Sequence, residues 1–336
     1  MLVSRSSPDS ASRAAIRLLM EWLPGASAVE GSSEIDLSSR ADQPQLISAE
    51  IVEGTMLRAF KVPGVTRTMV SGFGAFLDGT QKVRMIGRHV GVPLVLGTTS
   101  AAIRVRVNRR LVTWGQSPPR VEKKLYLPLR YLPPPTEALG AGSQLKYRHF
   151  RIVDTSLPDA SGAYPSEHPT VLLERAIRAV DRQRDALEDD FAEAWCASAA
   201  GPVFIDGGIS RSGRVASSVN AIGVIKSHFT LYVEGDALRA VVGLTKGERS
   251  SVFQVAPRSR SEVMSWYLRL REPEGQDALW GLVRIEMSVC DNPTERADEI
   301  SRWVLAESSP LALPDGRWDK MSYGIRDVEE FLRAIS

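Results

Sequence analysis

The chain has 336 residues, enough for one large or two medium domains, and its 43% hydrophobic and 24% charged content is ordinary for a soluble globular protein. The formal net charge is +2, two cysteines argue against a disulfide framework, and four scattered histidines argue against a histidine-built metal site. No apolar run approaches the roughly 20 residues that span a membrane, and no apolar secretion segment begins the chain. We therefore expect a cytoplasmic protein with no membrane partner.

The first third of the chain predicts a short helix followed by strands. Residues 12–23 have apolar positions at helical spacing, and 26–46 are polar and read as a loop. From 70 to 107 the pattern is typical of strands, and the last strand alternates between apolar residues and a cationic face. Several prolines then predict an irregular excursion at about 108–165.

The second half predicts a long helix and alternating elements. The helix is expected from Pro169 to about Cys196, with Ser166 as a candidate cap. Further strands are predicted at 202–206, 219–227, 231–233, 264–271 and 279–288, and further helices at 237–245, 294–306 and 328–334. This order favours an α/β fold with a mixed sheet flanked by helices. We expect an N-terminal helical and irregular extension over 1–69 and one main domain over 70–336.

Two short apolar runs each end in Asp-Gly, at Asp78-Gly79 and at Asp206-Gly207. A strand that delivers a carboxylate at its end is a common way to place a metal ligand at the rim of a sheet. Oxygen-only sites suit Mg²⁺ or Mn²⁺, and paired metals of this kind support phosphodiester chemistry. Asp-Gly is also common in ordinary turns, which is the competing interpretation.

The long helix offers a third carboxylate, and helix geometry favours Glu188. A strand rises about 3.3 Å per residue, so Asp206 lies roughly 15 Å from the preceding turn. A helix rises about 1.5 Å per residue, so the level of Asp206 corresponds to residues 185–189. Glu174 then lies too close to the N-terminal end of the helix, and Glu193 lies too close to its C-terminal end, to be level with Asp206. Within the uncertainty of the helix end, the open alternatives are Asp185 and Asp189.

A strongly basic stretch is the second functional feature. Residues 104–151 carry eleven cations and two anions, with aromatic residues between them. Cations for phosphates and aromatic faces for bases are what a nucleic-acid channel requires. A solubilising surface balanced by acidic helices is the alternative. The candidate DNA contacts are Arg104, Arg106, Arg109, Arg110, Lys123 and Lys124.

Lys226 and His228 end an apolar strand and are candidate catalytic residues. Either side chain could contact a scissile phosphate or protonate a leaving group. Lys226 could equally begin a solvent-exposed turn, and His228 could be a satisfied surface histidine.

Six short segments occur in this order along the chain: Phe76-Leu77-Asp78-Gly79, Arg184-Asp185-Ala186-Leu187-Glu188, Phe204-Ile205-Asp206-Gly207, Gly223-Val224-Ile225-Lys226-Ser227, Arg317-Trp318-Asp319 and Tyr323-Gly324-Ile325-Arg326. In these segments the chain resembles the NurA family of DNA-end-processing nucleases over about residues 70–330. The resemblance implies an RNase H-like core, with Asp78, Glu188 and Asp206 binding Mn²⁺ or Mg²⁺. It also implies a homodimer that docks on a hexameric HerA-type DNA-pumping ATPase.

One departure from the family pattern concerns the C-terminal end. The family usually carries a histidine there, and this chain has none after His228. Asp327 or Glu329 are the candidate substitutes. The sequence therefore predicts a metal-dependent deoxyribonuclease, with two alternatives. One is a catalytically silent DNA-binding subunit that regulates an ATPase, and the other is an unrelated α/β enzyme.

Overall fold

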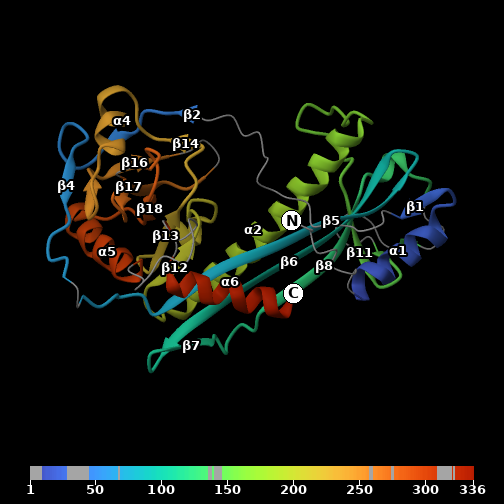
Figure 1. Ribbon diagram of the computed structural model, residues 1–336, viewed down its shortest axis with the longest axis horizontal. Helices are drawn as coiled ribbons and strands as arrows, with labels where there is room; N and C mark the ends of the chain where they lie inside the picture. Colours follow the sequence, from blue (N-terminus) through green and yellow to red (C-terminus); the bar gives the residue numbers. More distant parts are fainter. Residues whose placement is uncertain are drawn as a thin grey trace.

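The computed structural model describes residues 10–28, 45–66, 69–134, 138–139, 146–256, 260–273, 276–308, 320 and 322–336. They form a mixed α/β fold in which one large sheet crosses the molecule and helices cover both of its faces (Figure 1). Of the helices in these ranges, none has the length and apolar character required to cross a membrane. The segment 317–319, part of the family resemblance, lies outside the described residues.

The helices agree with the sequence prediction in type and order. The three expected C-terminal to the long helix are present, with one extra short helix, α3. The N-terminal helix and the long helix α2 are also confirmed, although the cap of α2 is His168, whose ring Nδ1 accepts from the Thr170 amide, and not Ser166. The bounds are α1 Ser10–Trp22, α2 Pro169–Ser198, α3 Gly213–Ala216, α4 Gly235–Val242, α5 Pro293–Glu307 and α6 Tyr323–Ile335.

The strands of the large sheet follow the order β3-β16-β17-β18-β13-β12-β5-β6-β8-β11-β10-β9, with β1, β4, β7 and β15 paired beside this path. Strands β2 and β14 pair with each other in a separate two-stranded sheet. In chain order, the first eleven strands are β1 Ala26–Ala28, β2 Gln45–Leu46, β3 Glu50–Ile51, β4 Ala59–Lys61, β5 Ala75–His89, β6 Val92–Val107, β7 Arg110–Thr113, β8 Arg120–Leu127, β9 Ala138–Leu139, β10 Lys146–Tyr147 and β11 Phe150–Asp154. The remainder are β12 Val203–Asp206, β13 Ala221–Ile225, β14 Thr230–Leu231, β15 Glu248–Ser250, β16 Phe253–Val255, β17 Val263–Arg269 and β18 Leu282–Met287.

Two predictions about this sheet are wrong. The apolar run before Asp78 does not end a strand, because β5 continues to His89 and forms a long hairpin with β6. Residues 120–127 are not irregular, because they form β8 and pair with β6 over seven positions. In both places a polar or basic strand is stabilised by its pairing partners, which local composition does not reveal.

Strands from before residue 70 also join this sheet. β1 pairs with the far end of β5, β3 pairs with β16, and β4 pairs with β15. The expected N-terminal extension therefore contributes to the same sheet as the rest of the chain.

The centre of the sheet positions the site. β5 is antiparallel to β6 and parallel to β12, and β12 is parallel to β13. Successive residues of β5 enter different cores, because side chains alternate across a strand. Leu77 packs with α2 residues on one face, and Phe76 packs with α5 and α6 residues on the other. The sheet therefore separates α2 from α6 at this point.

Helix α6 lies close to the sheet at Gly324. A Cβ atom added there would lie 2.3 Å from ring atoms of Phe76, closer than packed carbon atoms approach. The absence of a side chain thus allows α6 to dock on β5, and Val328 and Leu332 follow it into the core on the same helix. In Figure 1, α6 crosses in front of β5 and β6.

We predict that Gly324→Ala lowers the free energy of unfolding by about 1–3 kcal/mol, because the added methyl overpacks the contact with Phe76. Urea denaturation measures the change. Gly115→Ala is the matched control, since a Cβ there meets nothing within 4 Å. Equal stability of the two variants would contradict the close docking of α6.

Candidate metal centre

Asp78 and Asp206 are neighbours because of the register between β5 and β12. Leu77 pairs with Ile205 in the parallel ladder, so the next residue in each strand is an aspartate. Each aspartate lies two residues after a phenylalanine of the α6-facing core, and residues two apart share a face. Both carboxylates therefore lie on the side of the sheet covered by α6.

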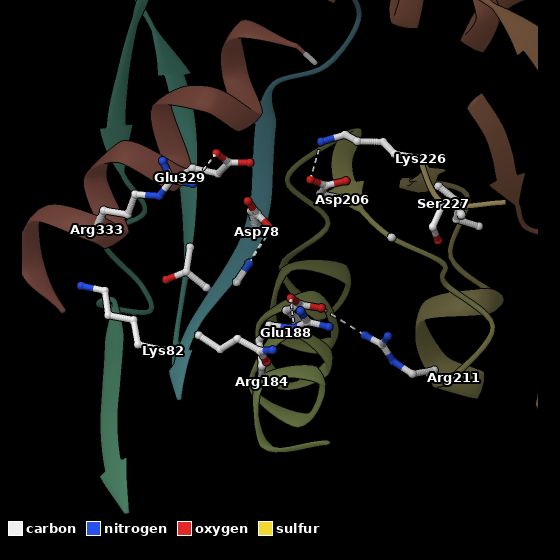
Figure 2. A pocket seen from close by; sticks show the side chains of 15 residues that line it. Asp78, Lys82, Arg184, Glu188, Asp206, Arg211, Lys226, Ser227, Glu329 and Arg333 are labelled. Atoms are coloured by element: carbon white, nitrogen blue, oxygen red, sulfur yellow. Dashed lines mark hydrogen bonds and ion pairs between the residues drawn. The ribbon is translucent and has the colours of Figure 1, made fainter. Parts of the chain in front are cut away.

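Glu329 on α6 completes a group of three carboxylates. One oxygen each of Asp78, Asp206 and Glu329 lie within 4.8 Å of one another. In Figure 2 these side chains meet between β5, the end of β12 and α6. Carboxylate oxygens are the ligands that Mg²⁺ and Mn²⁺ prefer, so the group has the chemistry of a divalent-cation site.

The alternative candidate Asp327 is used differently. Its carboxylate accepts a 2.8 Å bond from the Arg104 guanidinium and is 40% exposed. Of the two residues considered for the late position, Glu329 is the one that the structure brings to Asp78 and Asp206.

Glu188 lies beside this group without belonging to it. It is buried on α2 and forms 3.3 Å ion pairs with Arg184 and with Arg211 (Figure 2). Its carboxylate is not among the three that lie within 4.8 Å of one another in the described part of the chain. Burial raises the pKa of Glu188 to about 7, against the opposing effect of the two arginines. Glu174 is exposed and does not line the cavity described below.

The glycine at position 79 leaves room for the Glu188 side chain of α2 to lie against β5. A Cβ atom on Gly79 would lie 2.5 Å from a Glu188 carboxylate oxygen. The Glu188 side chain therefore occupies the space that a side chain at position 79 would fill. The Asp-Gly pair here is a packing requirement inside a strand and not a turn.

Lys226 is the internal counter-ion of the group. Its ammonium donates a 2.6 Å hydrogen bond to Asp206, and both side chains are largely buried. Burial opposes the charged ammonium, but the carboxylates of Asp206 and Asp78 outweigh it and raise the pKa of Lys226. The ammonium therefore stays charged at neutral pH.

The surroundings of Asp78 disfavour the ionised form of its carboxyl group. Burial, followed by the carboxylates of Asp206 and Glu188, raises its pKa well above the usual range, and Lys226 opposes this. Like charges held this closely favour a cation among them. The three carboxylate oxygens and the repulsion between these negative charges both fit a bound divalent metal.

The carboxylates line one wall of a cavity of about 850 Å³. The cavity lies along β5 residues 79–82, where β12 has ended and β1 has not yet begun to pair. Its other walls are cationic, and Figure 2 shows these side chains around the carboxylates. They are Lys82, Arg184, Arg211 and Arg333. Arg184 belongs to a segment of the family resemblance. The other three cations are single residues on separate elements or loops, and no pattern in the sequence points to them.

The turn after Asp206 is held by a buried ion pair. Glu286 on β18 accepts a 2.8 Å hydrogen bond from the Ile209 amide and a 2.7 Å bond from Arg284. Since both charged side chains are buried, the pair fixes the backbone that follows β12 and Asp206.

The predicted DNA contacts Arg104 and Arg106 are bound within the protein. Arg104 bonds Asp327 and stacks on Phe331 of α6. Arg106 forms two bonds with the buried carboxylate of Glu307 on α5. The cationic face of β6 thus anchors the C-terminal helices.

The other predicted contacts differ in exposure. Arg109 and Arg110 are exposed at the β6–β7 turn. Lys124 is largely buried and bonds Glu122 and Gln183, while Lys123 is half-buried. None of these four side chains lines the cavity. Their contact with DNA stays a prediction.

His228 lies outside the cavity, against Tyr267. Its Nε2 is 2.7 Å from the Leu282 carbonyl oxygen, which can only accept, so Nε2 carries the proton. Burial, with a smaller contribution from nearby cations, lowers the pKa of His228 to about 4. The structure gives His228 a packing role.

We predict a pH-dependent stability from His228. The unfolded histidine binds a proton near pH 6.5 and the folded one near 4, so stability is lost as pH falls between these values. The loss is at most about 3 kcal/mol. His228→Gln keeps a donor for Leu282 and should flatten the difference in urea unfolding between pH 7 and 4.5. The same slope in both proteins, or a loss of any metal-dependent activity, would contradict the packing role.

We predict that Glu329→Gln weakens Mn²⁺ binding at least tenfold, because it removes one ligand charge and keeps the side-chain size. Isothermal titration calorimetry measures the affinity. Glu330→Gln is the control, since Glu330 is the next residue on α6 and is 62% exposed.

Glu188→Gln distinguishes the two assignments of the third ligand. If Glu188→Gln loses Mn²⁺ and Glu329→Gln retains it, the sequence-based ligand set is right and the set drawn from the structure is wrong. Glu174→Gln should bind Mn²⁺ as the unmodified protein does.

The chain matches no known family model, and a search of curated proteins finds no match.

Proposed function

We propose that the protein is a metal-dependent DNA nuclease. The observation that carries the proposal is the group of carboxylates from Asp78, Asp206 and Glu329, which faces a cavity with cationic walls. Anionic ligands for a divalent cation beside cations for phosphate groups are the two requirements of phosphodiester hydrolysis. Neither feature alone is specific, but their occurrence in one cavity favours this reaction class.

Each part of the cavity has a role in this proposal. A bound Mg²⁺ or Mn²⁺ would polarise the scissile phosphate and activate a water molecule. Asp78, Asp206 and Glu329 hold the cation. The cavity cations neutralise the phosphates on either side of the cleaved bond. Glu188, held between Arg184 and Arg211, keeps those guanidinium groups in the wall and adjoins Asp78.

Lys226 acts in this proposal by its charge. Its pKa is raised, so the ammonium is a poor proton donor at neutral pH and a persistent positive charge beside Asp206. Such a charge stabilises the negative charge that develops on a phosphoryl oxygen.

We further propose that β8-β6-β5-β12-β13 is an RNase H-like core. After β5 the chain adds β6 and β8 on one side of that strand and later adds β12 and β13 on its other side, so Asp78 and Asp206 lie where the strand order reverses. In open α/β sheets, ligands bind at such a switch in strand order. By resemblance to the NurA family, DNA is the substrate, the protein is a homodimer, and a hexameric HerA-type ATPase is its partner.

One observation favours a second candidate function. The ammonium of Lys226 already bonds Asp206, so part of the acidic group is neutralised without a metal. A catalytically silent DNA-binding subunit that regulates an ATPase would need no bound metal, and this lysine–aspartate pair would be sufficient to balance part of the charge. Such a subunit would bind DNA with strong salt dependence and show no metal-dependent cleavage.

We predict that linear DNA is cleaved with Mn²⁺ and not with chelator. Asp78→Asn and Asp206→Asn should each lower the cleavage rate at least 100-fold, because each removes a ligand charge. Both should keep the fold and DNA binding, measured by circular dichroism and fluorescence anisotropy. In the apo protein the melting temperature of Asp78→Asn should hold or rise, since a like charge is removed from the group.

Asp190→Asn is the control for these variants, because Asp190 lies on α2, is exposed, and pairs only with Arg120 among the described residues. Cleavage that survives either site variant would refute the metal centre. Salt-sensitive DNA binding with no cleavage by the unmodified protein would instead support the silent subunit.

A further inference from the structure

A second cavity lies at the carboxyl end of β11, away from the candidate metal centre. Its volume is about 310 Å³, and it is enclosed by the segment that follows β11 and by the first half of α2. The residues that line it are Asp154, Thr155, Leu157, Pro158, Arg175, Arg178 and Arg182. β11 is parallel to β8, and the carboxyl ends of parallel strands are where α/β sheets bind ligands.

The arginines of this cavity form one row along α2. Arg175, Arg178 and Arg182 are spaced by three and four residues, so they share a face of the helix. Arg175 donates to the Leu157 carbonyl oxygen, which ties the loop to the helix. Arg178 and Arg182 are exposed and form no ion pair within the described part of the chain. Two guanidinium groups are therefore available to a ligand.

Thr155 supplies an independent observation. Its side chain is 6% exposed, and its hydroxyl has no hydrogen-bond partner among the described residues. Its backbone amide is already used, since it donates to the Leu127 carbonyl oxygen. Buried hydroxyl groups are normally paired, because an unpaired one costs stability. An acceptor oxygen from a ligand would satisfy this group.

The acidic residues nearby do not take the place of such a ligand. One oxygen of Asp154 accepts from the Leu129 amide, the Ser156 amide and the Ser156 hydroxyl, so it holds the loop. Asp159 is fully exposed, lies near Arg175 and bonds its own loop. The cavity lining thus carries three guanidinium groups against one carboxylate that is engaged elsewhere.

We propose that this cavity binds a phosphate group. Guanidinium groups match phosphate oxygens in geometry and charge, and the Thr155 hydroxyl adds a neutral donor. The volume is at the lower end of small-molecule sites, which suits a mononucleotide or the terminal nucleotide of a strand.

The site is separate from the metal centre. Arg182 lies six residues before Glu188, about 9 Å along the helix and about 240° around it, so the two face different sides of α2. The proposal therefore does not depend on the nuclease activity. The phosphate can come from a free nucleotide or from a DNA strand, and the experiment distinguishes these sources.

Binding is measured by calorimetry in the presence of chelator, so that no metal contributes. The probes are inorganic phosphate, dAMP, and one single-stranded oligodeoxynucleotide with and without a 5′-phosphate. The variants are Arg178→Gln with Arg182→Gln, and separately Thr155→Val, which keeps the side-chain shape. The control is Arg13→Gln with Arg17→Gln, since these are also exposed arginines four residues apart on a helix.

We expect dAMP or the 5′-phosphorylated strand to bind the unmodified protein, with affinity at least tenfold lower in the arginine variant and several-fold lower in Thr155→Val. The control pair should leave binding unchanged. If dAMP binds more tightly than the oligodeoxynucleotide, the natural ligand is a free nucleotide. If binding of the oligodeoxynucleotide requires its 5′-phosphate, the ligand is the end of a DNA strand. Either result supports the phosphate site. No binding by the unmodified protein, or equal loss in the control pair, would overturn it.

Discussion

The candidate site depends on the length of one parallel strand pairing. β12 pairs with β5 only as far as Leu77 and Ile205 and then turns away, while β5 continues to His89. This register places Asp78 beside Asp206. It also leaves residues 78–86 of β5 without a strand partner on that edge among the described residues, because β1 pairs only from Gly87 onward. The cavity lies along this open edge, so the early end of the β12–β5 pairing produces both the acidic group and the space in front of it.

A concentration of buried carboxylates is costly, and the protein compensates in two ways. Lys226 neutralises part of the charge at Asp206, and Arg184 and Arg211 neutralise Glu188. Within the described part of the chain Asp78 forms no ion pair of its own; its carboxylate accepts a hydrogen bond from the Gly79 amide, and Lys226 acts on it only through its charge. The uncompensated charge is therefore at the centre of the group, where a divalent cation would have three oxygen ligands.

The basic strand β6 shows why charge counts along a sequence do not identify a binding surface. Arg104 and Arg106 hold Asp327 and Glu307, so they fasten α6 and α5 to the sheet. α6 carries Glu329, and its docking also needs the missing side chain of Gly324. Arg104 therefore acts on the candidate metal centre by holding the helix that carries the candidate ligand Glu329, whereas Arg106 holds α5. The cations that face the cavity come from four separate elements or loops.

The sequence by itself determined the α/β class of the fold and singled out Asp78 and Asp206 as candidate ligands. Apolar periodicity specified the helices, and the apolar runs before Asp78 and Asp206 specified buried strands, because these are local properties of the chain. Helix and strand rise also favoured Glu188 over Glu174 as the residue level with Asp206, and Glu188 lies in the cavity lining while Glu174 does not.

Only the tertiary structure decided the rest. Glu329 joins Asp78 across more than 200 residues, and the separation of Arg104 from the cavity depends on carboxylates supplied by distant helices. The continuation of β5 past Gly79 depends on its pairing with β6. Contacts of this kind are set by packing between elements, and no local pattern in the sequence encodes which charged side chains will meet.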